Sequence, residues 1–459
     1  MKSRRIVLAV LVAWMLSCQT INRMIATPTP LPTFTPIPTF TFTPTPEPLK
    51  PAYIPPECAA VPLATAIPNA QAESTPEVEP NPELSTTEQL DVFNELTDIV
   101  SKVYVYPDFN GRNWNEIQSR YEAQVNAGLD TESFYRAMSE MIFELGDEHS
   151  FFLSPSEVKQ SNAELEGNVE FVGVGIYGQT DLERGRHIVI STFPGSAADQ
   201  SGIQPHDAIL KVDGVPVTEG SGFNLRGPKC SAVVMTVQSP GGEPRDVMLV
   251  RHNVQGGLDI DARLVPTTDG SKIGYIFIPS FFDETIPPQI ERALEEFGIL
   301  DGLILDVRVN GGGSSGVVDP IFAHFVSGRL GQFVTREESR PYRIEADPIA
   351  NSQTVPLVVV VSEDTASYGE IFAGVLRDQG RAKVTGEDSL GNVEVLYGFT
   401  FDDGSQVWIA SATFRPENSS ENWEETGIVT DLPAFAPWDT FIFETDPSIA
   451  AALTLLGHQ

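Results

Sequence analysis

The sequence predicts an α/β multidomain protein with an N-terminal helical region, a β-rich domain and an α/β core. Three observations support this class. Apolar residues recur at helical spacing from residue 85, short strands separated by glycines fill residues 168–253, and strands alternate with helices beyond residue 256. A chain of 459 residues has room for two or three domains and a sizeable core.

Charge and motif content restrict the partners of the chain. Lys and Arg total 29 against 63 Asp and Glu, which gives a formal net charge of −34. Such a body repels nucleic acid and anionic membrane surfaces. Neither a metal-ligand cluster nor a phosphate loop appears in the sequence, and Gly173-Val-Gly175 lacks the third glycine of a dinucleotide fingerprint. We expect no nucleic-acid partner, no metal and no cofactor.

The first residues are typical of an export signal. Basic residues precede an apolar run that ends at Ser17-Cys18, so residues 1–18 are predicted to be a signal peptide or a lipoprotein signal. Cys18 is then a candidate for a lipid anchor, and the protein is expected to be extracytoplasmic, either secreted or anchored to the cell membrane. The remaining cysteines, Cys58 and Cys230, form a disulfide or are two unrelated thiols.

Residues 19–84 are predicted to be a disordered linker, with a Pro/Thr-rich, polyproline-like stalk over residues 27–48. The helical region, residues 85–167, begins with a capping-box pattern from Ser85 to Glu88, and further helices are expected over residues 114–125 and 131–145. A polar turn containing His149 follows the last of these helices. A lone loop histidine is either a solvated surface residue or a catalytic base.

Residues 168–255 resemble a PDZ domain along their whole length. The match includes Pro194 to Ala198 and the strand and turn from Asp207 to Gly214. The resemblance implies that a polypeptide C-terminus is bound as an added strand, with its carboxylate held by backbone N–H groups of a glycine-containing loop. That loop corresponds to Phe171, Val172, Gly173, Val174 and Gly175. The alternative is a small β-domain that only packs.

The α/β core is expected over residues 256–445, followed by a C-terminal tail over residues 446–459. An apolar strand, Leu357 to Val361, leads into a turn at Ser367 that opens a helix. Unpaired N–H groups at a helix N-terminus stabilise an oxyanion, so Ser367 is a candidate nucleophile. Alternatively, Thr365 or Ser367 only caps the helix, with Glu370 completing a capping box.

Several motifs together resemble the carboxyl-terminal processing peptidases, also called tail-specific proteases. They are the PDZ-like segment, Leu305 to Gly313, Thr365 to Ile371, Gly380-Arg-Ala and Gly386-Glu. The resemblance implies an α/β core of the ClpP/crotonase type with Ser367 as the nucleophile. It also implies an oxyanion hole formed by Gly312 and the N–H of Tyr368.

The chain differs from that family at the position of the general base. Its usual lysine corresponds to Asn392 and its orienting glutamine to Leu396, and neither can deprotonate a hydroxyl. Lys383 does not align with the base and is expected on the surface. The tricorn-type branch uses a histidine and a glutamate, which correspond here to His149 and Glu424. Glu425, Glu394 and Glu370 compete with Glu424, and Asp147 is another candidate partner of His149.

The predicted function is that of an exported serine endopeptidase, which captures polypeptide C-termini with its PDZ domain and cleaves with Ser367, His149 and Glu424. Two alternatives stay open. One is a catalytically inactive pseudo-protease that binds peptide tails, and the other is a cell-surface scaffold that uses the Pro/Thr stalk. The sequence gives no oligomeric state.

Overall fold

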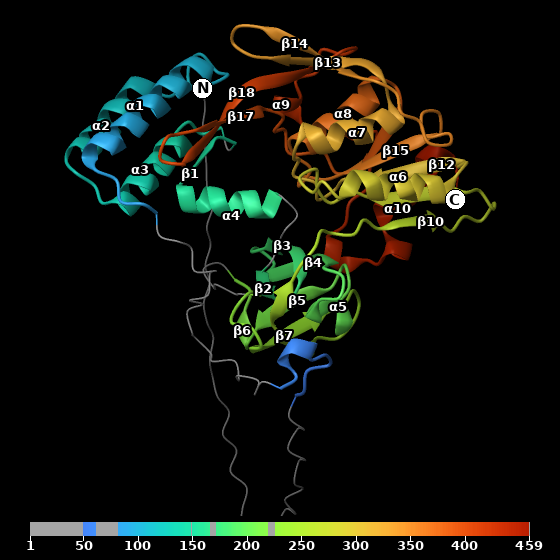
Figure 1. Ribbon diagram of the computed structural model, residues 1–459. Helices are drawn as coiled ribbons and strands as arrows, with labels where there is room; N and C mark the ends of the chain where they lie inside the picture. Colours follow the sequence, from blue (N-terminus) through green and yellow to red (C-terminus); the bar gives the residue numbers. More distant parts are fainter. Residues whose placement is uncertain (1–48, 61–80, 148, 166–170, 219–224, 459) are drawn as a thin grey trace, which may run out of the picture. The chain divides into compact units, whose positions relative to one another are not determined.

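The computed structural model describes residues 49–60, 81–147, 149–165, 171–218 and 225–458 (Figure 1). The chain divides into two compact units, Met1–Pro48 and Leu49–Gln459, and everything described belongs to the second. The predicted signal, the lipid site at Cys18 and the stalk therefore lie outside the described residues. Within the described ranges, no helix combines the length and apolarity that a membrane crossing needs.

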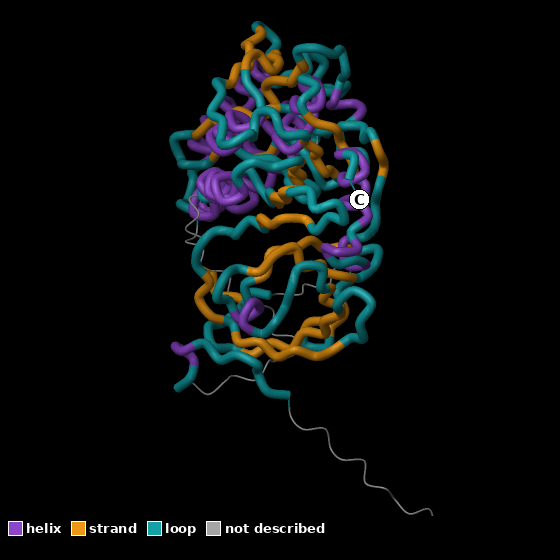
Figure 2. The backbone as a smooth tube through the Cα atoms, turned by 90° about the vertical axis from the view of Figure 1, so that its right-hand side faces the viewer, coloured by secondary structure: helices purple, strands orange, loops and turns teal. Residues whose placement is uncertain are grey.

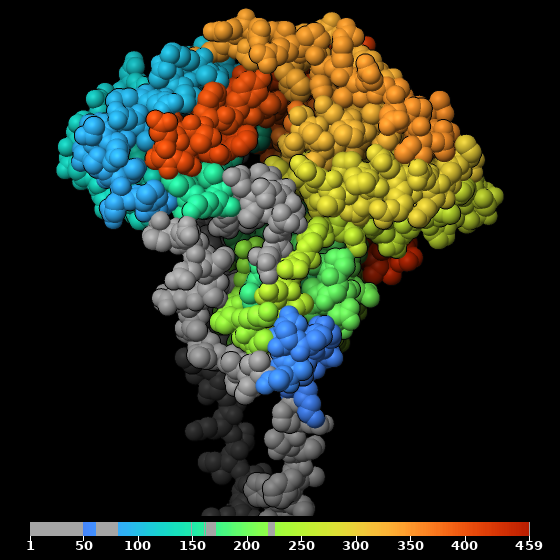
Figure 3. All heavy atoms as spheres, in the orientation of Figure 1, coloured from blue at the N-terminus to red at the C-terminus, as the bar shows by residue number. Residues whose placement is uncertain are grey.

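The helical region forms because each helix has one apolar face and a polar N-cap. The predicted capping box is confirmed: Ser85 accepts the Glu88 N–H, and the Glu88 side chain accepts the Ser85 N–H. The apolar faces pack against Val407 and Ile409 of the second half of the chain, and Figure 3 shows that late segment against the blue helices. The elements are α1 (Thr86–Val103), α2 (Trp114–Asn126), α3 (Thr131–Phe143), β1 (Phe151–Leu153) and α4 (Pro155–Leu165).

The β-rich domain is a small antiparallel sheet with strand order β3-β4-β5-β7-β8, and β2 pairs separately with β9. Val189, Val233 and Leu249 are fully buried in its core, which explains the alternating apolar pattern of these strands. The elements are β2 (Phe171–Gly173), β3 (Ile176–Asp181), β4 (Arg186–Thr192), α5 (Ala197–Gln200), β5 (Ala208–Val212), β6 (Val215–Pro216), β7 (Ala232–Gln238), β8 (Arg245–Val250) and β9 (His252–Val254).

A short part of the predicted linker is held on this β-rich domain. Residues 49–60 contain η1 (Pro56–Cys58), and Cys58 forms a disulfide with Cys230. Tyr53 packs against the core of the domain. The disulfide decides between the two alternatives left open for these cysteines, and it explains why residues 49–60 are ordered although their composition is typical of a linker.

The core sheet has strand order β10-β11-β12-β15-β16-β19, and all its pairs are parallel except β10 with β11. β12 and β15 are buried along their whole length, as expected for strands of a parallel sheet that is covered on both faces. Figure 2 shows the helices, strands and loops of the chain in a second view. The elements are β10 (Ala262–Val265), β11 (Ile273–Phe277), α6 (Ile286–Phe297), β12 (Gly302–Asp306), α7 (Ser315–Phe325), β15 (Leu357–Val361), α8 (Tyr368–Asp378), β16 (Ala382–Gly386), β19 (Leu432–Pro433) and α10 (Pro447–Leu456).

Helix α10 lies in the segment expected to be a tail. Asp446 caps its N-terminus, accepting the Ser448 N–H, and Ile449 and Ala452 pack on Val358 and the rest of the sheet face opposite α6, α7 and α8. The apolar run after Asp446 needs a partner surface, and this face of the parallel sheet, on which Ile188 and Ile190 of the β-rich domain also pack, supplies it.

A second sheet joins the helical region to the core. Strand β18 pairs with β1 near Trp408 and with β13 near Phe414. The turn that carries His149 directly precedes β1, so this pairing fixes that turn against the core. The remaining elements are β13 (Gly328–Val334), β14 (Ser339–Ile344), β17 (Val395–Thr400), β18 (Gln406–Pro416), α9 (Trp423–Thr426), η2 (Trp438–Thr440) and η3 (Phe443–Thr445).

Ion pairs connect the β-rich domain to the core. Arg184 and Arg186 each place a guanidinium nitrogen against the Asp439 carboxylate, at 2.7 and 2.6 Å. Beside them, the ring of His206 stacks on Trp438 with 4.5 Å between centroids. These contacts join strand β4 and the adjacent turns to the segment that precedes α10.

Candidate active site

Ser367 lies between β15 and α8 in a strained backbone conformation, with φ 54° and ψ −125°. Its N–H donates to the Asn392 carbonyl at 2.7 Å. The Ser367 hydroxyl makes no capping hydrogen bond. Thr365 instead donates its hydroxyl to Val307 O and accepts the Ser362 N–H. The geometry therefore disfavours the cap interpretation of Ser367, which leaves the hydroxyl available for chemistry.

The glycine turn after β12 meets Ser367 because β12 and β15 are parallel neighbours. Gly312 has φ +100°, and a Cβ there would lie 2.6 Å from Ser367 Cβ and 3.1 Å from the Tyr368 nitrogen. Only glycine permits this approach. Within the described chain, no acceptor takes the N–H of Tyr368, the first residue of α8.

The N–H of Gly312, a predicted oxyanion-hole donor, is already hydrogen-bonded within the protein. Its N–H donates to Asn310 Oδ1 at 2.9 Å, and Asn310 Nδ2 in turn donates to the Ile278 carbonyl. Gly312 therefore brings the turn close to Ser367, while its N–H is held by a side chain that the sequence analysis did not single out. The Asn-Gly-Gly-Gly order was the available signal, because a short amide side chain readily binds the backbone two residues on.

Glu370 anchors the turn opposite the nucleophile. It is fully buried, and its carboxylate accepts hydrogen bonds from the Ser389 hydroxyl, the Gly391 N–H and the Asn392 N–H. Burial raises the pKa of Glu370, and these three donors oppose that effect. Glu370 is thus neither a capping-box residue nor a ring partner of His149. It holds the turn whose carbonyl receives the Ser367 N–H.

The ring of His149 contacts a carboxylate, and that carboxylate belongs to Glu394. His149 Nδ1 lies 3.0 Å from Glu394 Oε2. Asp147 accepts the backbone N–H groups of His149 and Ser150, so it shapes the turn. A carboxylate at Nδ1 holds the proton there and leaves Nε2 as an acceptor. No hydrogen bond joins His149 to Ser367 in the described part of the chain.

Glu424, the expected acid, does not contact the His149 ring. It lies next to Glu394, the residue that does. Glu424 Oε2 accepts the Val393 N–H at 2.7 Å, and its side chain is hydrogen-bonded to Glu394. Burial and the Glu394 carboxylate raise the pKa of Glu424 to about 9, so this group is protonated at neutral pH. The two residues are 30 positions apart in sequence, and only the fold decides which one meets His149.

Glu394 is held in its ionised form. Burial acts to raise its pKa, but hydrogen bonds from His149, Glu424 and Tyr106 lower it below the ordinary value. The Tyr106 hydroxyl donates to Glu394 Oε1 at 2.7 Å. Burial and the Glu394 carboxylate raise the pKa of Tyr106, so the phenol remains a donor. Sequence reasoning missed Tyr106, which has no motif of its own.

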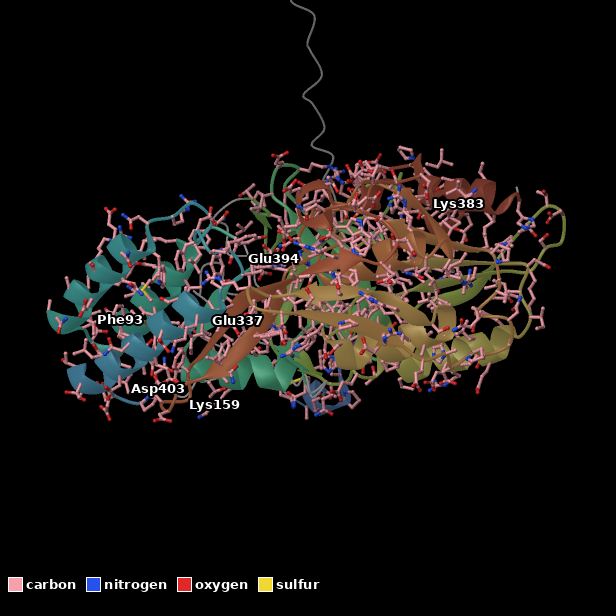
Figure 4. The ribbon with its side chains drawn as sticks, turned by 90° about the horizontal axis from the view of Figure 1, so that it is seen from above. Phe93, Lys159, Glu337, Lys383, Glu394 and Asp403 are labelled. Carbon is pink, nitrogen blue, oxygen red and sulfur yellow. A yellow bond between two sulfur atoms is a disulfide. The ribbon has the colours of Figure 1, made fainter. Side chains whose placement is uncertain are left out.

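The other candidates lie elsewhere. Lys383 is exposed on β16, as expected, and Figure 4 shows it well away from Glu394. Glu425 is exposed, and Leu396 packs against the helical core. In the ranges that the structure covers, no three His, Cys, Asp or Glu side chains are arranged to hold a metal ion.

The loop predicted to bind the peptide carboxylate, residues 171–175, is hydrogen-bonded to other backbone segments on both sides. Strand β2 pairs with β9, and on its other side the Val174 N–H donates to Leu225 O. The next strand, β3, pairs only with β4 among the described strands, so its outer edge is the place where a peptide strand can add. A cavity of about 670 Å³ runs from residues 179–184 to residues 362–364, just before Ser367.

A larger cavity of about 1120 Å³ is lined by Glu394, the residue that contacts His149, and by Glu424. Asn392, Tyr106 and Arg336 also line it. Arg336 donates to the carbonyls of Ser101 and Tyr106, both at 2.8 Å, so it fastens the end of the helical region to the turn between β13 and β14. The lining of this cavity is mixed, with polar residues such as Glu394 and apolar ones such as Phe414.

Three family profiles match the chain in order. Residues 85–143 match "Tricorn protease C1 domain", residues 161–222 match "PDZ domain", and residues 272–434 match "Peptidase family S41". The PDZ interpretation of the β-rich domain and the peptidase interpretation of the core are thereby confirmed.

Relatives of the whole chain agree with these profiles. "Carboxyl-terminal-processing peptidase 2, chloroplastic" of Arabidopsis thaliana is 30% identical over 390 residues, covering 80% of this chain and 74% of the relative. "Carboxyl-terminal-processing protease" of Synechocystis is 28% identical and covers 81% and 87%. The solved "Photosystem II D1 C-terminal processing protease" superposes with a TM-score of 0.55 at 25% identity, covering 79% of this chain and 99% of that one.

Proposed function

Since the chain belongs to the carboxyl-terminal processing peptidases, a family of serine-type peptidases with a PDZ domain, we propose that it is an exported endopeptidase that uses Ser367 as nucleophile and His149 as general base. The observation that carries this proposal is the position of Ser367. It is strained, its hydroxyl caps nothing, and Gly312 approaches it so closely that no side chain fits between them.

In the proposed reaction, the Ser367 hydroxyl attacks the scissile carbonyl and its proton passes to His149 Nε2. The Tyr368 N–H binds the oxygen that becomes negatively charged. Collapse of the tetrahedral intermediate breaks the C–N bond, and His149 returns the proton to the leaving amine. Water then hydrolyses the acyl-enzyme by the same route. Ser367 binds the Asn392 backbone and His149 binds Glu394, so both approach one short segment.

Glu394 and Glu424 support His149 as a pair that shares one proton. Glu394 stays ionised and stabilises the imidazolium that forms during attack, while protonated Glu424 and Tyr106 hold Glu394 in place. In this proposal His149 takes the role of the family's lysine, because the residue at the lysine position is Asn392 and cannot accept the proton.

Capture of polypeptide C-termini is the proposed role of the PDZ domain. The free edge of β3 offers backbone groups to an added strand, and the 670 Å³ cavity leads from this domain toward the turn before Ser367. Export is supported by the disulfide between Cys58 and Cys230, because disulfides persist in oxidising compartments. A Cys18 lipid anchor at the cell membrane agrees with this location.

The second candidate function is binding of polypeptide tails without cleavage, and the absence of a Ser367–His149 hydrogen bond favours it. A fluorophosphonate probe and a labelled unfolded protein substrate separate the two functions. We expect Ser367→Ala to abolish labelling and cleavage, and His149→Ala to reduce cleavage by at least about 10²-fold. Lys383→Ala is the control and should match the native chain. Equal behaviour of the native chain and Ser367→Ala would leave only binding.

A further inference from the structure

Arg336 is a partly buried cation without a carboxylate partner. It lies in the turn between β13 and β14, and no Asp or Glu in the described ranges forms an ion pair with it. The arginines before and after it, Arg329 and Arg340, both pair with glutamates, at 2.8 and 2.6 Å. Burial lowers the pKa of Arg336, and its Nε has no acceptor within the described chain. A cation taken out of water without a counter-ion costs free energy, which points to a use other than stability.

The guanidinium of Arg336 holds one segment of the helical region. Nη1 donates to Ser101 O and Nη2 donates to Tyr106 O, both at 2.8 Å. The guanidinium carbon also lies 5.3 Å from the centre of the Phe109 ring, a cation–π contact. The two hydrogen bonds have sequence separations of 235 and 230, so a turn of the second half of the chain fixes the segment that follows α1.

Tyr106 connects this contact to the proposed base. Its carbonyl accepts from Arg336, and its hydroxyl donates to Glu394 Oε1 at 2.7 Å. Glu394 in turn lies 3.0 Å from His149 Nδ1. Burial raises the pKa of Glu394, and the Tyr106 hydroxyl is one of the donors that lower it. A hydrogen bond weakens steeply with distance and angle, so the Tyr106 backbone has to stay in place for this bond to persist.

The backbone of this segment has little other support from the core. Among the described residues, the main chain of residues 104–106 donates one hydrogen bond to the second half of the chain, from the Val105 N–H to Ala410 O at 2.8 Å. The Ala410 N–H donates to Ser150 Oγ at 3.0 Å, so the same residue of β18 also holds the turn that carries His149. A single hydrogen bond lets the segment pivot about it. Arg336 supplies the further points that fix the direction of the tyrosine side chain.

We propose that Arg336 is a positioning residue for the proposed hydrolysis: it holds the backbone of Tyr106 so that the Tyr106 hydroxyl keeps donating to Glu394. This assignment rests on the proposed function for the roles of His149 and Glu394. Arg336 itself contacts none of the reacting groups, so it acts on the rate through Tyr106. The turn between β13 and β14 thereby contributes to the strength of a base that lies on another part of the chain.

A double-mutant cycle with Arg336→Met, Tyr106→Phe and the double variant tests the assignment on a labelled unfolded protein substrate. Arg336→Met keeps an apolar stem and removes the donors, and Tyr106→Phe removes only the hydroxyl. We expect each single variant to lower kcat about tenfold and to keep KM within about twofold, because an outer partner of a catalytic group is worth about 10–100-fold in activity. The double variant should be no slower than the slower single variant, since both changes break the same chain of contacts.

Controls separate this role from a general loss of stability. Arg340→Met should keep the native kcat, because Arg340 lies on the same hairpin, is 65% exposed and pairs with Glu338. Arg336→Lys can serve one of the two carbonyls, so its kcat should lie between those of the native chain and Arg336→Met. If Arg336→Met does not fold, Arg336→Lys combined with Tyr106→Phe gives the same cycle. Losses that multiply in the double variant, or a lower Tm with native kcat, would overturn the role of Arg336. Native activity of His149→Ala, or no fluorophosphonate labelling of the native chain, would overturn the proposed function instead.

Discussion

The close approach of Gly312 to Ser367 predicts a large effect for a single methyl group. Gly312→Ala would place Cβ 2.6 Å from Ser367 Cβ and 3.0 Å from its hydroxyl oxygen. Carbon atoms in ordinary contact are about 3.5–4.0 Å apart, so the turn and the nucleophile must separate by about 1 Å. A displacement of that size in a reacting group costs about 10²-fold in rate.

The backbone adds a second penalty at the same position. Gly312 has φ +100°, and a left-handed conformation costs an L-residue about 1–2 kcal/mol. We therefore expect Gly312→Ala to lower kcat/KM by at least about 100-fold and to lower the Tm by roughly 1 °C for each kcal/mol of strain. The assay is continuous cleavage of a labelled unfolded substrate, with thermal unfolding followed by circular dichroism.

The neighbouring glycine provides a matched control. A Cβ at Gly311 would meet no atom within 4 Å, and its φ is not in the left-handed region. Gly311→Ala should keep kcat/KM within about twofold of the native value, since nothing has to move. If Gly312→Ala were as active as Gly311→Ala, the contact between Gly312 and Ser367 would not be part of the active arrangement, and the proposed nucleophile site would be refuted.

The remaining predictions concern the carboxylates and the disulfide. Glu394→Gln should lower kcat by about 10²–10⁴-fold, because it removes the charge at His149 Nδ1. Glu424→Gln should change kcat less than about tenfold. Steady-state kinetics measure both, and equal losses would contradict the assignment of Glu394 as the partner of His149. The pKa of Glu424 is raised to about 9, so its contribution to the free energy of unfolding is full at low pH and is lost as pH rises through that value. The urea midpoint of the Glu424→Gln variant should therefore fall less between about pH 5 and about pH 9 than that of the native chain. Replacing Cys58 and Cys230 by Ser opens a loop with a sequence separation of 172, which should cost up to about 5 kcal/mol in the urea unfolding free energy. Reduction of the native chain should reproduce that loss, and an unchanged free energy in both would argue against the bond.

Much of the fold follows from local pattern. The helix after Ser85 and the buried strand Leu357–Val361 were both predicted, because periodicity and capping are read from neighbouring residues. Helix α10 was expected to be a tail because a short apolar segment has no defined structure until a partner face exists. Only the sheet supplied that face.

The sequence by itself determined the family, the order of the domains and a serine at a strand-to-helix turn, since these depend on motifs in which the residues are close together. The tertiary structure decided which groups meet across long separations. It placed Glu394 at His149 and Glu424 beside Glu394, and it paired Cys58 with Cys230. The physical reason is that β18 joins the helical region to the core through hydrogen bonds between distant strands. Such pairing fixes side-chain neighbours that no local pattern encodes.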